Sequence, residues 1–172
     1  MKRTNKAALF LASMLLSSQL LALEDDLQQP LQIAADKAYF DQNTGTAIYE
    51  GNVIAKQGSI NIQASYLKVT SNTETNQFNQ LDATGTPAKF SQQVNINGDM
   101  MISHGDTILY RTTDALLEIT GNSYVKRIGD EISADYIQYA IDKGTFVAEK
   151  KNTGRVTMTL QPQPQTETQE GQ

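Results

Sequence analysis

The chain has 172 residues, with 14 lysines and arginines against 19 aspartates and glutamates, a single histidine and no cysteine. Its net charge of −5 and the lack of a basic stripe argue against nucleic-acid binding. Without cysteine there is no disulfide framework, and one histidine cannot supply the usual nitrogen and sulfur ligands of a zinc site.

Residues 1–22 have the pattern of a secretory signal peptide. Lys2, Arg3 and Lys6 precede an uncharged apolar run at 7–16, which is too short to span a bilayer. We expect cleavage after Ala22; an uncleaved membrane anchor is the alternative, and a lipoprotein anchor would need a cysteine. Removing 22 of the 172 residues leaves 150, and removing three of the 14 basic residues leaves 11 against 19 acidic ones, a formal charge of −8.

Residues 23–160 are expected to form one domain that is nearly all β. Gln29-Pro30 would end any helix before Leu31. After it, apolar residues alternate with polar ones and show no helical spacing. Turn signals such as Gly51-Asn52, Asn97-Gly98 and Gly121-Asn122 recur at short intervals, which predicts about a dozen or more short antiparallel strands. The polar segment 73–80 is interpreted as a loop between repeats, and the segment 161–172 as a disordered polar tail.

A short sequence motif occurs four times within this domain. It consists of apolar residues at alternate positions, a small residue, then an acidic or hydroxyl residue at Asp36, Ser65, Asp106 or Asp135, with apolar residues two and four places later. Asp36 and Asp106 are 70 residues apart, as are Ser65 and Asp135. The matched offsets predict an internal duplication, whereas four unrelated hairpins sharing turn residues would not produce them.

This repeated motif also predicts a bend in the strand. The apolar positions change parity at the small residue, so a strand that keeps one face buried needs an extra residue there, a β-bulge that bends it. Each copy is therefore interpreted as a strand turning a corner in a rolled sheet. We expect Asp36, Asp106 and Asp135 to accept hydrogen bonds from backbone donors at these corners.

No arrangement typical of catalysis is present. Ser103, His104 and Asp106 are crowded into one strand corner, unlike a catalytic triad whose members come from separate elements. The sequence holds no glycine-rich phosphate loop. We therefore expect neither enzymatic activity nor a metal or other cofactor.

The apolar residues of one parity are expected to line the inner face of the rolled sheet and to be candidate lipid contacts. Periodicity leaves open whether this face packs shut as a core or stays splayed as a groove. A groove would suit acyl chains, since each buried methylene contributes about 0.8 kcal/mol. The candidates are Leu31, Ile33, Phe40, Tyr49, Val53, Ile60, Ile62, Leu67, Val69, Phe90, Ile108, Tyr110, Leu117, Ile119, Ile132, Ile137 and Tyr139.

The first and last strands of an open sheet leave backbone groups unpaired. We place these edges at about 31–40 and 155–160, with Leu31, Ile33, Arg155, Thr157 and Leu160 as the residues that meet partners.

Short motifs in a fixed order run from Gln29 to Leu160. They are Gln29-Pro30-Leu31, Ile33, Asp36, Tyr49-Glu50-Gly51-Asn52-Val53-Ile54, Gln57-Gly58, Ile60, Ile62, Ala64, Gly85-Thr86-Pro87-Ala88-Lys89-Phe90, Tyr110, Thr120-Gly121-Asn122, Ile132 and Arg155-Val156-Thr157. None is specific alone, but the ordered set resembles the OstA-like family of periplasmic lipopolysaccharide-transport proteins in Gram-negative bacteria. The resemblance implies an open, twisted β-jellyroll whose interior holds the acyl chains of lipopolysaccharide between the inner and outer membranes.

The resemblance also implies partners. It implies end-to-end homo-oligomers, the strand from Leu31 facing an inner-membrane partner (LptC), and the strand 155–160 facing an outer-membrane partner (LptD) or another copy. Leu31, Ile33, Phe90 and Tyr110 match interior positions best. Ala38 and Ala47 depart from the pattern, being small where a larger apolar residue would line the groove. A structural β-filament or adhesion module without lipid is the alternative reading.

Overall fold

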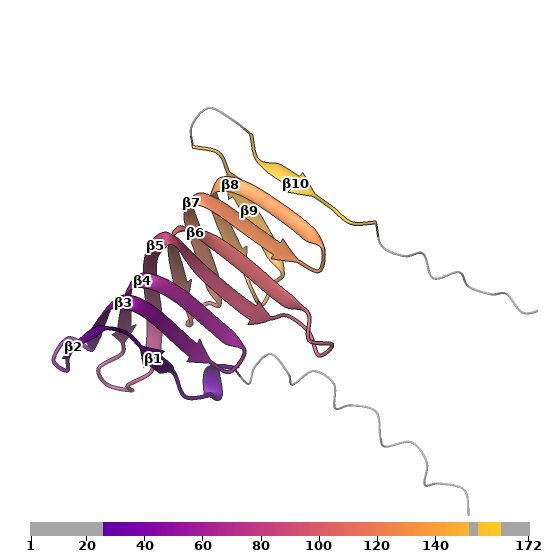
Figure 1. The fold of residues 1–172 in the computed structure, drawn as a ribbon. Helices are drawn as coiled ribbons and strands as arrows, with labels where there is room; N and C mark the ends of the chain where they lie inside the picture. Colours follow the sequence, from indigo (N-terminus) through magenta and orange to yellow (C-terminus); the bar gives the residue numbers. More distant parts are fainter. Residues whose placement is uncertain (1–25, 152–154, 163–172) are drawn as a thin grey trace, which may run out of the picture.

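A computed structural model describes residues 26–151 and 155–162, which form one open antiparallel sheet of ten strands (Figure 1). The proposed signal peptide lies outside the described residues, as does the proposed tail apart from Gln161 and Pro162. Within the described residues, no helix is long and apolar enough to cross a membrane.

The elements follow one another in a simple up-and-down order. Neighbours in the sheet run β1-β3-β4-β5-β6-β7-β8-β10, while β2 also pairs with β3 and β9 also pairs with β8. The bounds are η1 Asp26–Gln28, β1 Gln32–Ala34, β2 Lys37–Asp41, β3 Thr46–Gln57, β4 Ile60–Ser71, β5 Phe78–Gln93, β6 Met100–Arg111, β7 Leu116–Arg127, β8 Asp130–Ala140, β9 Thr145–Glu149 and β10 Thr157–Thr159.

The sheet is folded across its own strands into two layers that meet at a bend (Figure 1). Layer 1 comprises β1, β10 and the segments 53–57, 60–64, 88–93, 100–105, 123–127 and 130–134. Layer 2 comprises β2, β9 and the segments 46–50, 66–71, 78–84, 107–111, 116–120 and 136–140. Opposite the bend, the hairpin turns of each layer form the rim of the folded sheet.

The open antiparallel jellyroll is confirmed, but the strands are fewer and longer than expected. Strands β3 to β8 each contain 11 to 16 residues. The reason is that each continues through the bend, so that what the turn signals suggested were two short strands is one long strand spanning both layers.

The predicted bulges lie at this bend. The register shifts between Gln63 and Tyr66 in β4, and between His104 and Thr107 in β6. In β4, the buried residues are Ile60 and Ile62 before the shift and Leu67 and Val69 after it. The change of parity therefore keeps one face buried on both sides of the corner, as the repeated motif predicts.

The internal duplication appears as a repeated corner. Gly51 and Asn52 have φ of 77° and 45°, and Gly121 and Asn122, 70 residues later, have φ of 76° and 48°. A Cβ at either glycine would collide with the carboxylate of Asp36 or Asp106, respectively. The carboxylates therefore pack against bare backbone, which only glycine allows in this left-handed conformation.

The corner aspartates differ in their donors from the expectation. Asp36 accepts a hydrogen bond from Nδ2 of Asn52 at 2.8 Å, and Asn122 donates to Asp106 at 3.4 Å. In both cases the donor is the side-chain amide of an asparagine with positive φ in the neighbouring strand. Asp135 does accept a backbone N–H, from Lys151 at 3.1 Å, and it also pairs with the ammonium of Lys150 at 2.6 Å.

The two layers enclose an apolar core. Leu67, Leu117, Ile119 and Ile137 have no exposed surface at all. The ring of Tyr110 in layer 2 meets that of Phe90 in layer 1 edge to face, with centroids 5.6 Å apart. Periodicity left open whether the inner face packs shut as a core or stays splayed as a groove. In the middle of the interior, it packs shut as a core.

Gly51→Ala should destabilise the protein more than Gly98→Ala. Both glycines have positive φ, but a Cβ at Gly98 meets nothing within 4 Å, whereas one at Gly51 strikes Asp36. We expect Gly51→Ala to lower the free energy of unfolding by about 1–3 kcal/mol more than the control, as measured by urea denaturation. Equal losses in the two variants would contradict a tight corner.

The free energy of unfolding should decrease in alkaline solution because of Tyr110. Burial, with a smaller contribution from Asp26, raises the pKa of Tyr110 to about 12 from 10.0. Between these values the unfolded chain releases a proton that the folded protein retains, so stability decreases by about 3 kcal/mol as pH rises through this window. Tyr110→Phe should flatten the dependence of the unfolding free energy on pH above 10; an unchanged slope would contradict this assignment.

Candidate functional site

The candidate site is the inner face of the folded sheet. The structure puts every predicted candidate on this face, and most are buried. Leu31, Ile33 and Tyr49 are partly buried, and Phe40 is 65% exposed. Phe40 is exposed because β2 is the terminal strand of layer 2, with no further strand to cover its inner side. Whether these residues contact lipid stays a prediction.

Several inner-face residues were missed by the sequence analysis. Leu81, Met101 and Val125 are fully buried in β5, β6 and β7. The alternation of Leu81 with Ala83 could have revealed the first of these. Phe146 in β9 stacks on Tyr139 with centroids 4.1 Å apart, and the parity of its short strand was the available signal.

A small cavity of about 150 Å³ opens at the β2 end of the interior. Its walls are formed by the residue before β1 and by residues of β1, β2, β3, β4 and β5. They are Leu31, Ile33, Phe40, Ala47, Tyr49, Val69, Ser71 and Phe78. Ala47, noted above as unusually small, therefore lines open space at this end.

The rim of layer 1 at this end is covered by η1. The carboxylate of Asp26 accepts hydrogen bonds from N and Oγ of Ser59, both at 2.6 Å, and from Nε2 of Gln92 at 3.1 Å. Gln57 donates from Nε2 to the carbonyl of Gln29 at 3.0 Å. The segment before β1 is thus fastened across the turn between β3 and β4.

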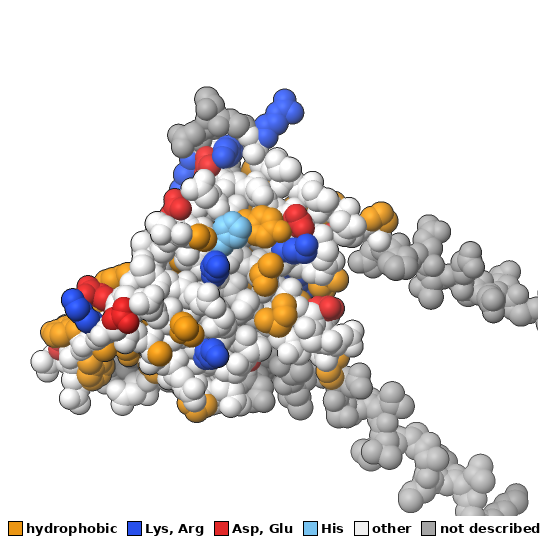
Figure 2. Space-filling model, viewed as in Figure 1, with side chains coloured by type: hydrophobic (Ala, Val, Ile, Leu, Met, Phe, Trp, Pro, Cys, Tyr) orange, Lys and Arg blue, Asp and Glu red, His pale blue; other side chains and the backbone are white. Residues whose placement is uncertain are grey.

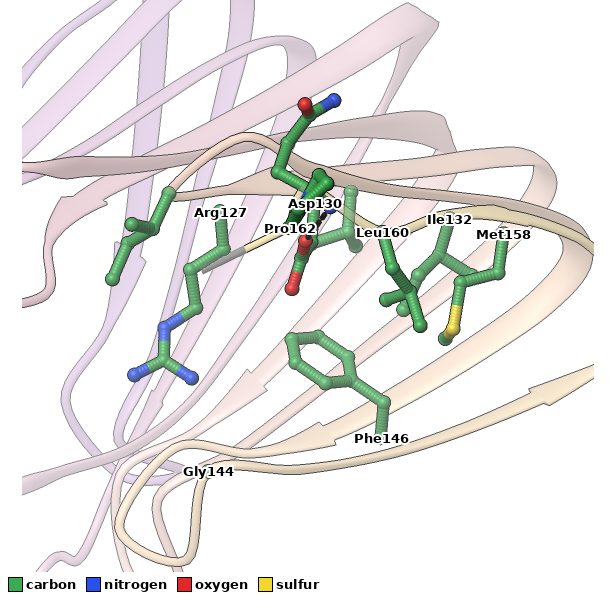
Figure 3. Close-up of a pocket in the computed structure, with 11 residues that line it drawn as sticks. Arg127, Asp130, Ile132, Gly144, Phe146, Met158, Leu160 and Pro162 are labelled. Carbon is green, nitrogen blue, oxygen red and sulfur yellow. Dashed lines mark hydrogen bonds between the residues drawn. The ribbon is translucent and has the colours of Figure 1, made fainter. Parts of the chain in front are cut away.

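A larger cavity of about 620 Å³ lies at the β9 and β10 end. Figure 3 shows Arg127 on one side of it, Ile132, Met158 and Leu160 on the other, and the ring of Phe146 between them. Val125, Ile128, Asp130, Gly144, Gln161 and Pro162 complete its lining. The neighbouring Tyr139 is buried, which raises its pKa, and the charge of Arg127 acts in the opposite direction.

The sheet has an open edge at each end within the described residues. Beyond β1 and β2, and beyond β9 and β10, no strand is paired. Of the predicted edge residues, Ile33 lies in β1 and Thr157 in β10, while Leu31, Arg155 and Leu160 flank these strands. Strand β9, which the sequence analysis did not include, forms the layer 2 part of the second edge.

The one histidine belongs to the outer surface. His104 stacks on Tyr124 with ring centroids 4.9 Å apart, whereas its neighbour Ser103 is buried on the inner face. Adjacent strand residues point to opposite faces, so no nucleophile and base converge here. The outer surface of layer 1 carries scattered lysine and apolar side chains (Figure 2).

Comparisons with known proteins agree with this architecture. The chain is 32% identical to the lipopolysaccharide export system protein LptA of Haemophilus influenzae, over 94% of this chain and 95% of that protein. It is 31% identical to LptA of Escherichia coli K12, over 93% and 88% of the two chains. The crystal structure of LptH, the LptA-homologous periplasmic component of the lipopolysaccharide transport device of Pseudomonas aeruginosa, matches with a TM-score of 0.73 at 24% identity, over 80% of this chain and 99% of that one.

The family model described as "LptA/(LptD N-terminal domain) LPS transport protein" matches residues 32–145, which run from the start of β1 to the start of β9. This is a family of transport proteins rather than enzymes, in agreement with the expectation from the sequence. The chain therefore belongs to the LptA/LptD N-terminal domain family of lipopolysaccharide transport proteins.

Proposed function

We propose that the protein binds lipopolysaccharide in the periplasm and forms part of a bridge between the inner and outer membranes. The acyl chains would lie between the two layers of the sheet. The observation that carries this proposal is a continuous apolar inner face between two layers that are joined at the bend, with free edge strands at both ends of the sheet.

The closed middle of the interior is compatible with lipid entry. The strands in extensive backbone contact are all neighbours in the sheet, so the layers face each other mainly through side chains. Separating the layers therefore breaks apolar packing but leaves the backbone ladders intact. Acyl chains inserted between the layers replace that packing, with each buried methylene contributing about 0.8 kcal/mol.

The open edges support the proposed partners. The β1 and β2 edge would receive an inner-membrane partner such as LptC, and the β9 and β10 edge would meet LptD or another copy. An added strand completes the hydrogen bonds of an exposed edge, and a second chain at each end extends the inner face.

A structural β-filament that binds no lipid is the competing function, since open edges alone allow it. The two functions differ in their cargo. Lipopolysaccharide that copurifies with the protein favours transport, and lipid-free rods favour the filament.

A photo-crosslinking residue at position 110 should capture lipopolysaccharide in cells, because Tyr110 lies on the inner face. The matched control is position 109, since Leu109 lies on the same strand and faces outward between Asp82 and Glu118. The readout is a lipopolysaccharide adduct detected by gel shift. Capture at neither position by a folded protein would favour the filament, and equal capture at both would contradict an interior path.

Deleting residues 155–172 should reduce self-association, because β10 and the layer 1 part of its edge are removed. Deleting only 163–172 retains β10 and serves as the control. Light scattering over a concentration series should show smaller particles for the first deletion alone. Unchanged particle size in both would argue against this edge as the contact.

A further inference from the structure

Arg127 is a cation at the end of the inner face of layer 1. It lies two residues after the buried Val125 and therefore on the same, inner face of the strand. It pairs in register with Met101 in β6 and with Asp130 in β8. Its Nε is buried and has no hydrogen-bond partner. The ion pairs found among the described residues use Arg111, Lys126 and Lys150, but not Arg127. A buried donor of this kind is costly unless something accepts from it.

The internal duplication provides a comparison within the same chain. The offset of 70 residues relates Arg127 to Gln57, and both end a strand of layer 1 at the rim. At the first site the chain supplies its own cover, since Gln57 donates to the carbonyls of Gln29 and Leu27, and the carboxylate of Asp26 lies beside them. At the second site, Gln161 donates its backbone N–H to Asp130 at 2.9 Å, and among the described residues Nε of Arg127 has no acceptor.

The surroundings of Arg127 indicate the class of ligand. A guanidinium presents a planar set of donors that fits the oxygens of a phosphate group. Next to it, the cavity of about 620 Å³ is walled by Ile132, Phe146, Met158 and Leu160. Such a wall takes a hydrocarbon chain, while the carboxylate of Asp130 in the same lining opposes a bound anion.

We infer that this cavity binds a phosphorylated acyl lipid, with the hydrocarbon against Phe146 and Ile132 and the phosphate on the guanidinium of Arg127. The inference rests on the proposed function and deepens it. The lipid phosphate takes the place that the chain's own polar groups occupy at the other end. Lipid in the interior would therefore be held by its head group where it meets the β9 and β10 edge.

The test compares two lipids with the same myristoyl chain, lysophosphatidate and the neutral monoacylglycerol, titrated below their micelle concentrations into the protein lacking residues 1–22. Calorimetry should give the wild type an affinity for lysophosphatidate about tenfold or more above that for monoacylglycerol. Arg127→Gln, which installs the residue found at Gln57, should remove most of this preference without changing monoacylglycerol binding. Arg127→Lys should keep part of it, and Asp130→Asn should increase it.

Lys126→Gln is the matched control, because Lys126 precedes Arg127, carries the same charge and faces outward in an ion pair with Glu131. It should leave the preference unchanged. The inference is overturned if Arg127→Gln keeps the full preference, if the wild type binds the two lipids equally or not at all, or if a preference appears only after residues 163–172 are removed.

Lipopolysaccharide binding by the same proteins separates this inference from the proposed function. If the wild type and Arg127→Gln bind lipopolysaccharide while the phosphate preference is absent, the inference fails and the transport function stands. If the wild type does not bind lipopolysaccharide, the proposed function itself fails.

Discussion

The structure depends on strands that continue unbroken through the bend. Because β3 to β8 each cross it, backbone hydrogen bonding ties all the strands into one sheet, and the two layers need only side chains between them. Asp36 and Asp106 pack against the glycines that turn these corners, and asparagine amides hold the carboxylates in place.

This arrangement makes the two ends of the molecule chemically different. At the β1 and β2 end, Asp26 and its partners fasten η1 across the rim, and the cavity beside Phe40 is small. At the β9 and β10 end, the cavity is about four times larger, as 620 Å³ compares with 150 Å³, and Nε of Arg127 has no acceptor among the described residues. Under the proposed function, the two ends would therefore offer a bound lipid different contacts.

The corners, the duplication and most of the buried inner face follow from the sequence. The parity change around Ser65 and the Gly-Asn pairs at Gly51 and Gly121 are local patterns, and local patterns determine bulges and left-handed turns. Strand length was misjudged because a turn signal inside a bent strand resembles one between two strands. The hydrogen bonds to Asp26 and the unpaired Nε of Arg127 depend on contacts between distant segments, such as the contact of Asp26 with Gln92. No local sequence pattern predicts such contacts.

The central claim is that acyl chains enter between the two layers, and the distance across the rim tests it most directly. Asn97 lies in the layer 1 turn between β5 and β6, and Thr113 lies in the layer 2 turn between β6 and β7. Since the chain has no cysteine, cysteines placed at these two positions can carry spin labels at defined sites. Pulsed electron paramagnetic resonance should show the inter-label distance lengthening when lipopolysaccharide binds. An unchanged distance in protein that has demonstrably bound lipopolysaccharide would contradict the account.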